Sequence, residues 1–399
     1  MPLPPLAVTA YTVVSCLGAG KQAMLQALLA RRSGLAPCAF EDARLPAHVG
    51  QIPDGELGPV IGALSEFDCR NHRIAQLALA QDGFEQAAAG AAARHGGDRV
   101  AVVLGTSTSG IHQTALAYRA RDPSSGKLPR DFHYASTHNI HALSAFVQGR
   151  LGLSGPSLVV STACSSSAKV FATAARMIAS GWCDAAVVGG ADSLCLTTLY
   201  GFNSLQLLSS RPCRPFDAER DGISIGEGGG FALLERADAA VAGSLALLGA
   251  GESSDAYHMS SPHPEGVGAK LAMQRALRAA GLQAQDIDYI NLHGTGTRSN
   301  DASEGKAVME VFGARTPVSS IKGALGHTLG ACGIEEAAAC LLAIENEFIP
   351  GSANTQAVDP AIGIDYAVQT RAGRVGRAMS NSFGFGGSNC TLVFGRLPR

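Results

Sequence analysis

The chain has 399 residues, of which 46% are hydrophobic and only 16% are charged. This length is ample for a large core, either in one big domain or in two packed halves. The formal charge of −2, from 31 basic and 33 acidic residues, argues against a nucleic-acid-binding surface. The low charge content also suggests that part of the surface is buried against another subunit.

The sequence shows no targeting or membrane-spanning segment. A secretory signal needs a basic region and a long apolar region, and residues 1–10 have neither. No stretch reaches the roughly 18 apolar residues of a membrane span. The ten cysteines form no CxxC pair, which is typical of reduced thiols. We therefore expect a cytoplasmic protein.

Short apolar runs alternate with alanine-rich runs in the first half of the chain. Residues 99–104 read as a buried strand that runs into a Gly/Ser/Thr turn. Residues 158–161 read as a second strand, which leads into Cys164. A helix predicted over 165–180 is apolar on nearly its whole circumference and should be buried. A third strand over 185–190 completes a rhythm that predicts parallel α/β layers.

The second half repeats this pattern. We predict a helix over 269–280, a strand over 287–292 and an alanine-rich helix over 334–345. The last helix follows a turn that contains His327, much as the helix over 165–180 follows Cys164. An internal duplication of one α/β unit is therefore plausible.

The boundary between the two halves is expected near residues 240–244. We accordingly divide the chain into 1–243, which carries the cysteine, and 244–399, which carries both histidines. Three segments lack clear periodicity. Long irregular loops in an enzyme often line the active site, and these segments are 122–134, 211–227 and 253–268.

Cys164 lies in the run 161–168, directly before the predicted helix. A helix N-terminus carries partial positive charge and unpaired N–H groups, so we expect it to favour the nucleophilic thiolate. His293 and His327 lie far downstream in glycine-rich turns. A thiolate can hold an acyl group covalently. Two neutral imidazoles can stabilise the enolate that decarboxylation of a malonyl-type thioester produces.

Several further motifs occur together with these residues, and their joint order is specific. The chain resembles a β-ketoacyl-acyl carrier protein synthase of the elongating type, in the thiolase-like superfamily. This resemblance implies a duplicated fold layered α-β-α-β-α, with two mixed five-stranded sheets. Besides the two histidine turns, the matching segments are 162–166, 214–217, 220–222, 226–228, 254–259 and 381–389.

The resemblance also implies the catalytic roles. Cys164 matches the nucleophile that accepts the acyl group. His293 and His327 match the pair that supports decarboxylation and condensation. Lys322 matches a lysine that tunes the electrostatics of the site, and Glu336 matches a carboxylate in the same network.

The remaining roles concern the substrate. Phe385 matches a mobile gate beside the cysteine, and its N–H with that of Cys164 would form the oxyanion hole. Thr295 and Thr297 match hydroxyls that bind the phosphopantetheine arm. Asp301 matches an acidic residue that we also expect at the substrate site.

The reaction implied is decarboxylative Claisen condensation with malonyl-acyl carrier protein, in fatty acid or in type II polyketide or aryl-polyene synthesis. The chain needs no cofactor of its own, because phosphopantetheine arrives on the carrier protein. We expect an acyl carrier protein as partner, and a homodimer or a heterodimer with a related subunit. We expect no metal, nucleic acid or membrane.

Two alternatives stay open. The chain could be a non-catalytic partner subunit of a heterodimeric ketosynthase, although such subunits usually lack the cysteine that is present here as Cys164. It could also be a coenzyme A-dependent thiolase. Thiolases, however, use one cysteine and one histidine with a second cysteine, whereas this chain has a histidine at both downstream motifs, His293 and His327.

Overall fold

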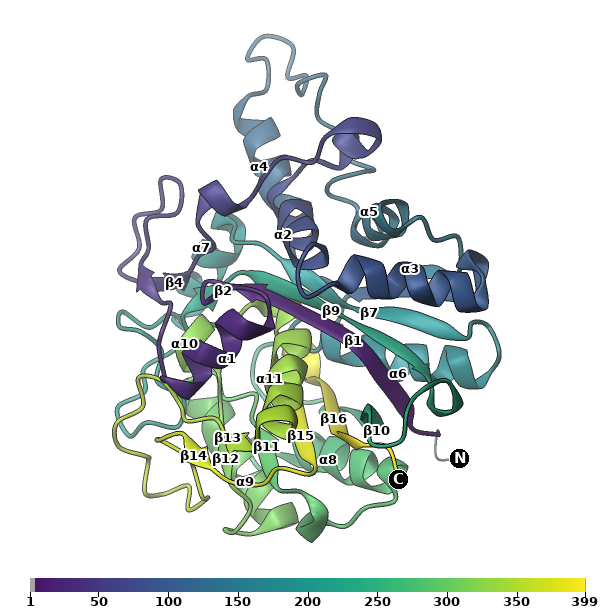
Figure 1. Cartoon of the computed structure of the whole chain (residues 1–399). Coiled ribbons are helices and arrows are strands. Elements are labelled where there is room, and N and C mark those ends of the chain that lie inside the picture. The colour runs from purple at the N-terminus through teal and green to yellow at the C-terminus, as the bar shows by residue number, and fades with distance from the viewer. Residues whose placement is uncertain (1–3, 399) are drawn as a thin grey trace.

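Two five-stranded half-sheets form the framework of the protein in the computed structural model, which describes residues 4–398 (Figure 1). The strand order in the first half-sheet is β6-β5-β7-β9-β1. The pairs β6–β5 and β5–β7 are parallel, whereas β7–β9 and β9–β1 are antiparallel. The strands are β1 (Leu6–Ser15), β5 (Val100–Gly105), β6 (Ser157–Val160), β7 (Ala185–Asp192) and β9 (Gly228–Arg236).

The second half-sheet repeats the first. Its order is β12-β11-β15-β16-β10, again with two parallel pairs followed by two antiparallel pairs. The equivalent strands also follow one another in the same chain order, so the predicted duplication is confirmed. The strands are β10 (Leu245–Ser254), β11 (Tyr289–Asn291), β12 (Val318–Ser319), β15 (Ala378–Gly384) and β16 (Ser388–Arg396).

The two half-sheets meet along one short contact between β1 and β10. Only Leu6 with Leu247 and Ala7 with Ala246 are paired there, in antiparallel register. The structure therefore confirms two mixed five-stranded sheets, joined edge to edge. The shorter strands lie outside this framework: β2 (Gly18–Ala19), β3 (Ala36–Pro37), β4 (His48–Gly50), β8 (Ile225–Gly226), β13 (Phe348–Ile349) and β14 (Arg371–Ala372).

Two helices of small residues form the middle layer. The helix α6 (Ser166–Ala179) packs against β5 and β7, and α11 (Cys332–Asn346) packs against β15, β9 and α6. They approach so closely that a Cβ on Gly333 would lie 2.4 Å from the backbone nitrogen of Ala168. Only a residue without a side chain fits there. The helix α1 (Lys21–Leu29) also contacts α11.

The outer helices complete the layers. Three helices cover the other face of the first half-sheet, and two contribute to the core beside the second (Figure 1). The former are α2 (Arg70–Leu79), α3 (Phe84–His95) and α5 (Ala142–Leu151), and the latter are α8 (Val267–Ala280) and α9 (Arg298–Phe312). The remaining helices are α4 (Ile111–Arg119), α7 (Leu196–Ser204) and α10 (Lys322–Leu325).

The helix α11 is buried along almost its whole length, from Cys332 to Ile344. An apolar sequence on all sides explains this burial. Glu335 and Glu336 are the two charged residues in that buried stretch, and each is at most 1% exposed. Buried carboxyl groups are costly unless they have partners. The middle layer is therefore the place to look for function.

The predicted elements agree with the structure. All seven predicted helices and strands are present, and their bounds differ from the prediction by no more than two residues. The three irregular segments contain at most two-residue pieces of helix or strand. The division between 1–243 and 244–399 stays a prediction. Within residues 4–398, no helix is long and apolar enough to cross a bilayer.

Candidate active site

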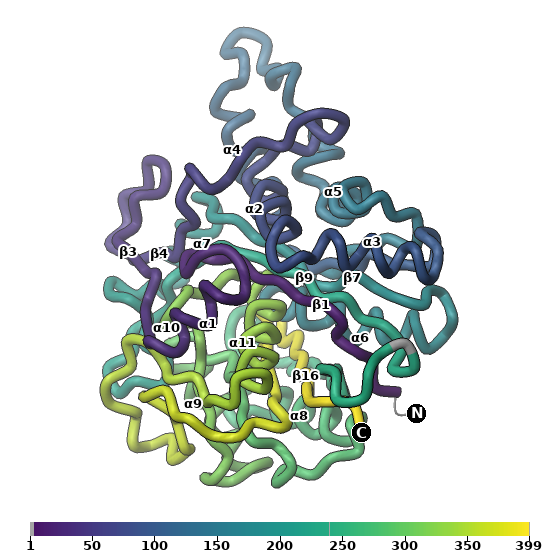
Figure 2. The backbone as a smooth tube through the Cα atoms, in the orientation of Figure 1, coloured from purple at the N-terminus to yellow at the C-terminus, as the bar shows by residue number. Residues whose placement is uncertain are grey.

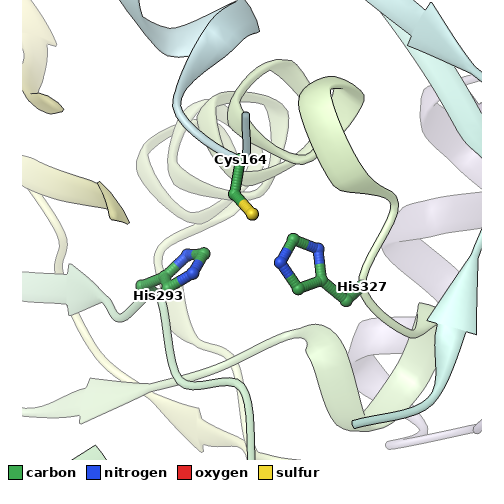
Figure 3. Close-up of side chains that lie close together, drawn as sticks. All are labelled: Cys164, His293 and His327. Atoms are coloured by element: carbon green, nitrogen blue, oxygen red, sulfur yellow. The ribbon is translucent and has the colours of Figure 1, made fainter. Parts of the chain in front are cut away.

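Cys164, His293 and His327 converge in one buried site (Figure 3). Cys164 follows β6, and His293 follows β11. His327 lies in the turn after β12 and α10. Because β6 and β12 are equivalent strands of the two halves, the cysteine and His327 occupy equivalent loops. The sulfur and one nitrogen of each ring lie within 4.8 Å of one another, and the ring centroids are 5.3 Å apart.

The Cys164 thiol is almost completely buried, with 5% of the residue exposed. Burial raises its pKa to about 11, although the Lys322 charge and the Phe385 backbone N–H act to lower it. At neutral pH the resting group is therefore a thiol. The prediction that this position favours the thiolate is wrong for the resting enzyme, because burial raises the pKa of the thiol.

The loop itself explains part of this outcome. The N–H of Ser165 donates to the Thr162 carbonyl oxygen at 3.4 Å, and that of Ser166 to the Ala163 carbonyl oxygen at 3.2 Å. These N–H groups at the start of α6 are thus already partnered. Ala163 has φ 52°, a left-handed conformation that a residue with a side chain rarely adopts. This bend turns Cys164 into the site.

The Lys322 ammonium group lies behind the two rings. Its Nζ donates to the His293 carbonyl oxygen at 2.6 Å, to His293 Nδ1 at 3.3 Å and to the Glu336 carboxylate. The Ser382 hydroxyl donates to the other oxygen of Glu336 at 2.7 Å. Burial acts to lower the pKa of Lys322, but the charge and hydrogen bond of Glu336, together with the Cys332 and Cys164 thiols, outweigh burial and raise that pKa. Lys322 is therefore charged.

Hydrogen bonds fix the tautomer of both histidines. A charged ammonium can only donate, so His293 Nδ1 is an acceptor and its proton lies on Nε2. The backbone N–H of Leu329 donates to His327 Nδ1 at 3.1 Å, with the same consequence. Burial and the Lys322 charge hold the pKa of both rings well below the usual value. The site therefore contains two neutral imidazoles, each with an Nε2–H.

The same side chains resemble a metal site in one respect. Cys164, His293 and His327 could offer three ligand atoms, as could His293, Cys332 and Glu336. In the second group, the Lys322 ammonium already bonds both His293 Nδ1 and Glu336. That fixed positive charge also lies behind the first group and opposes a cation there. The residues fit an anionic intermediate better than a metal ion.

A cavity opens from the reactive groups. Phe385 is half-buried at its wall, where its ring centroid lies 5.5 Å from that of Phe202. Its backbone N–H faces the sulfur of Cys164. One part of the wall is apolar and another carries hydroxyl and amide groups. The first comprises Phe202, Leu207, Ile223, Phe383 and Phe385, and the second Ser260, Ser261, Thr295, Thr297, Ser299, Asn300 and Asn389.

Thr295 and Thr297 both line this cavity. Their hydroxyl oxygens are 2.9 Å apart and hydrogen-bonded. Thr297 is also the N-cap of α9, where its hydroxyl accepts from the Asn300 N–H at 3.3 Å. Their placement is compatible with the predicted contact to a phosphopantetheine arm, which stays a prediction.

Asp301 does not line the cavity. It is fully buried and accepts hydrogen bonds from the backbone N–H of Phe216 at 2.8 Å and of Gly296 at 3.2 Å. Arg220 lies 3.6 Å from its second oxygen. These contacts fix the loop that follows His293. We therefore assign Asp301 a positioning role, in place of the substrate contact expected from the sequence.

Two buried carboxyl groups that the sequence analysis missed hold the reactive loops. Glu304 accepts from the backbone N–H of His293 at 2.9 Å and of Gly294 at 2.8 Å. Asp192 accepts from the Thr108 hydroxyl and from the Gly330 N–H, each at 2.6 Å. Asp192 ends strand β7, and Glu304 lies on the helix after the His293 turn. In the sequence, these residues could have been found as acidic residues at the end of a strand or in the helix that follows a reactive turn.

Comparison with known proteins places this geometry in a family. The model of the β-ketoacyl synthase N-terminal domain matches residues 4–240, and that of the C-terminal domain matches residues 245–356. Together these matches cover more than half of the chain. They include Cys164 in the first match and both histidines in the second.

Individual relatives support the same family assignment. The chain is 33% identical over 364 residues to 3-oxoacyl-[acyl-carrier-protein] synthase 2 of Vibrio cholerae, covering 84% of this chain and 88% of that protein. A chain of the ketosynthase (ApeO) in complex with its chain length factor (ApeC), from Xenorhabdus doucetiae, is 37% identical. It has a TM-score of 0.89 and 98% coverage of both chains. A chain of the AntDE:AntF complex, a type II PKS acyl-carrier protein with its ketosynthase, is 25% identical, with a TM-score of 0.84 and full coverage of both.

The raised pKa of Cys164 predicts how its alkylation depends on pH. Only the thiolate reacts, so the rate with iodoacetamide should rise throughout the range from pH 6 to about 9 without levelling off. Replacing Lys322 by Met removes a nearby positive charge and should lower the rate at each pH. Mass spectrometry of the peptide that contains Cys164 measures both rates. A plateau near pH 7 would contradict the assignment.

Proposed function

The chain belongs to the β-ketoacyl synthase family and is an acyltransferase, and on that premise we propose that it condenses an acyl group held on Cys164 with malonyl-acyl carrier protein. The product is a β-ketoacyl-acyl carrier protein, longer by two carbons. The observation that carries the proposal is the convergence of one buried sulfur with two imidazoles whose Nε2 atoms bear protons.

The first half-reaction transfers the acyl group to the cysteine. The Cys164 sulfur attacks the carbonyl carbon of an acyl thioester on the carrier protein, and the bond to the pantetheine sulfur breaks. The cysteine proton leaves with the pantetheine thiol. The backbone N–H groups of Cys164 and Phe385 would stabilise the oxyanion of the tetrahedral intermediate.

The second half-reaction forms the new bond. The thioester carbonyl of the malonyl group accepts hydrogen bonds from Nε2–H of His293 and of His327. As CO2 leaves, the electron pair of the broken bond forms an enolate whose negative oxygen these two donors stabilise. The carbon of the enolate attacks the acyl-cysteine carbonyl, and the sulfur departs as the leaving group. The Lys322 charge favours both anionic states.

The chain holds no resident cofactor in this scheme, since the phosphopantetheine is part of the carrier protein. The hydroxyls of Thr295 and Thr297 line the cavity where such an arm would pass. An acyl carrier protein as partner is also supported by the AntDE:AntF complex, which contains one.

The relatives support two candidate pathways for the substrate. A complex described as a ketosynthase with its chain length factor matches 98% of this chain at 37% identity. This likeness favours a discrete ketosynthase of a type II polyketide or aryl-polyene system. Elongation of fatty acids is the second candidate, favoured by the Vibrio cholerae relative. Two other functions are disfavoured, an idle partner subunit and a coenzyme A-dependent thiolase. The reason is that Cys164 and both histidines are present and lie together in one site.

A second subunit of the same fold is expected on one face. Among residues 4–398, strand β6 is an edge strand that pairs with β5 alone, and its residues are half-buried. The segment between α4 and α5 extends from the body of the protein (Figure 2). It exposes Tyr134 and Ile140, at 58% and 44%. Unpaired strand edges and apolar patches are typical of interfaces, so a copy or a related subunit would cover them.

We expect sedimentation equilibrium to show a dimer of the chain alone, or a one-to-one complex with a related subunit. Replacing Tyr134 and Ile140 by Asp together should dissociate it, since two charges would be buried at the interface. Val241→Asp, at a residue that is 79% exposed elsewhere, is the matched control and should change nothing. A wild-type chain that remains monomeric with either partner contradicts the proposal.

Cys164→Ala tests the nucleophile. The variant lacks the sulfur that would carry the acyl group, so acyl-enzyme formation and condensation should both be abolished. Mass spectrometry of the intact protein after incubation with an acyl-carrier protein detects the adduct. Detectable condensation by this variant would overturn the assignment.

His293→Ala and His327→Ala test the two donors. Loss of one oxyanion donor costs about 100- to 1,000-fold in rate. We therefore expect CO2 release from malonyl-acyl carrier protein to fall by that factor in each variant, while the Cys164 adduct still forms. Equal losses in both half-reactions would argue for a structural role of the histidines.

A further inference from the structure

Glu335 is a buried carboxyl group that the reaction described above does not use. It is 0% exposed and lies in the first turn of α11, next to Glu336. Glu336 has the Lys322 ammonium as its partner, whereas no cation from the described part of the chain bonds to Glu335. Burying a carboxyl group without a cation costs folding free energy, so a functional role for Glu335 has to be considered.

The two oxygens of Glu335 have different surroundings. Oε2 accepts a hydrogen bond from the hydroxyl of Thr328, which is also fully buried. Oε1 has no hydrogen-bond partner within residues 4–398. It lies against Gly228, where a Cβ would come within 2.1 Å of it. A glycine at the start of β9 thus makes room for this carboxyl group.

Thr328 lies in the turn that sets the tautomer of His327. It follows His327 directly, and the next residue, Leu329, donates its N–H to His327 Nδ1. Leu329 has φ 56°, a left-handed conformation that is strained for a leucine. Such a conformation persists only where neighbouring contacts hold it.

Two carboxyl groups hold this turn, one on each side of Leu329. Asp192 accepts from the N–H of Gly330 at 2.6 Å, and Glu335 accepts from the hydroxyl of Thr328. The Cys332 thiol adds a contact to the Leu329 carbonyl oxygen at 2.8 Å. The Leu329 N–H is therefore aimed at His327 by contacts on both sides.

We propose that Glu335 is a positioning residue that holds the His327 turn through Thr328 and so keeps the proton of His327 on Nε2. The inference rests on the proposed function, because it assumes that His327 donates this proton to the malonyl thioester. It adds to that function a residue that touches neither substrate nor reacting atoms.

The charge state of Glu335 supports this role. Burial raises its pKa to about 8, although the Thr328 hydrogen bond and the Lys322 charge act to lower it. The charges that face it also include Glu336 and Asp192, and the thiols of Cys16 and Cys332 lie close to it. At neutral pH the group is thus an uncharged acid. Above about pH 8 it would place a negative charge behind a forming enolate, which slows decarboxylation.

The experiment compares four variants. Glu335→Ala and Thr328→Val remove the hydrogen bond, and Thr328→Val does so without touching the carboxyl group. Glu335→Gln and Thr328→Ser preserve it. Glu345→Ala is the matched control, because Glu345 lies on the same helix and accepts a hydrogen bond from the Tyr11 hydroxyl, far along the chain from the turn.

Release of CO2 from malonyl-acyl carrier protein and acylation of Cys164 are measured separately. Glu335→Ala and Thr328→Val should slow CO2 release by about tenfold, the effect of one hydrogen bond to a key group. Acylation should change little. The Gln and Ser variants and the control should stay within about twofold of the wild type, and Glu335→Gln should lose the decline above pH 8.

A spectroscopic readout is independent of activity. In protein labelled with ¹⁵N-histidine, the His327 resonances, identified by their loss in His327→Gln, should indicate the Nε2–H tautomer in the wild type. They should indicate a mixture in Thr328→Val. If Glu335→Ala does not fold, Thr328→Val carries the test.

The possible failures are distinguishable. A wild-type enzyme that releases no CO2 contradicts the proposed function. An active wild type, with Thr328→Val unchanged in rate and tautomer, contradicts the role of Glu335. Equal losses in both half-reactions, or a similar loss in Glu345→Ala, would also contradict it, because a general effect on stability would then explain the result.

Discussion

One buried ammonium group determines the chemistry of the site. Lys322 Nζ bonds Glu336, the His293 carbonyl oxygen and His293 Nδ1, and each bond has a separate effect. The bond to Glu336 compensates the buried charge of Lys322. The bond to the His293 carbonyl oxygen fixes the loop that carries His293, and the bond to Nδ1 sets the tautomer of its ring. Removing either partner of a buried ion pair leaves an uncompensated charge, which is strongly destabilising. The stability of the middle layer and the reactivity of the site therefore depend on the same contact.

The duplicated fold explains why the reactive groups meet. Loops after the carboxyl ends of parallel strands commonly carry functional residues, and β6, β11 and β12 each supply one such loop. The half-sheets are arranged so that the loops after β6 and β12 bring Cys164 and His327 together. The close contact between Gly333 and Ala168 fixes the distance between these two helices. Small residues in the middle layer thus control the separation of sulfur and imidazole.

Local pattern was enough to predict three of the helices, four of the strands and the residues Cys164, His293 and His327, because periodicity and turns are local properties. The pKa of Cys164 was predicted in the wrong direction, since desolvation depends on what α11 and the Phe385 loop bury around it. Asp301 was expected at the substrate, but its contacts to Phe216 and Arg220 come from distant segments. Residues that hold a loop from another element leave almost no trace in the spacing of a sequence.

The equivalence of the β6 and β12 loops has an evolutionary consequence. Two copies of one unit in a single chain can change independently, whereas two identical subunits cannot. One loop could therefore acquire a nucleophile while its counterpart acquired a hydrogen-bond donor. A symmetric pair of separate subunits would have to carry both groups at each position. Fusion of the two units into one polypeptide thus permits a division of labour that symmetry forbids.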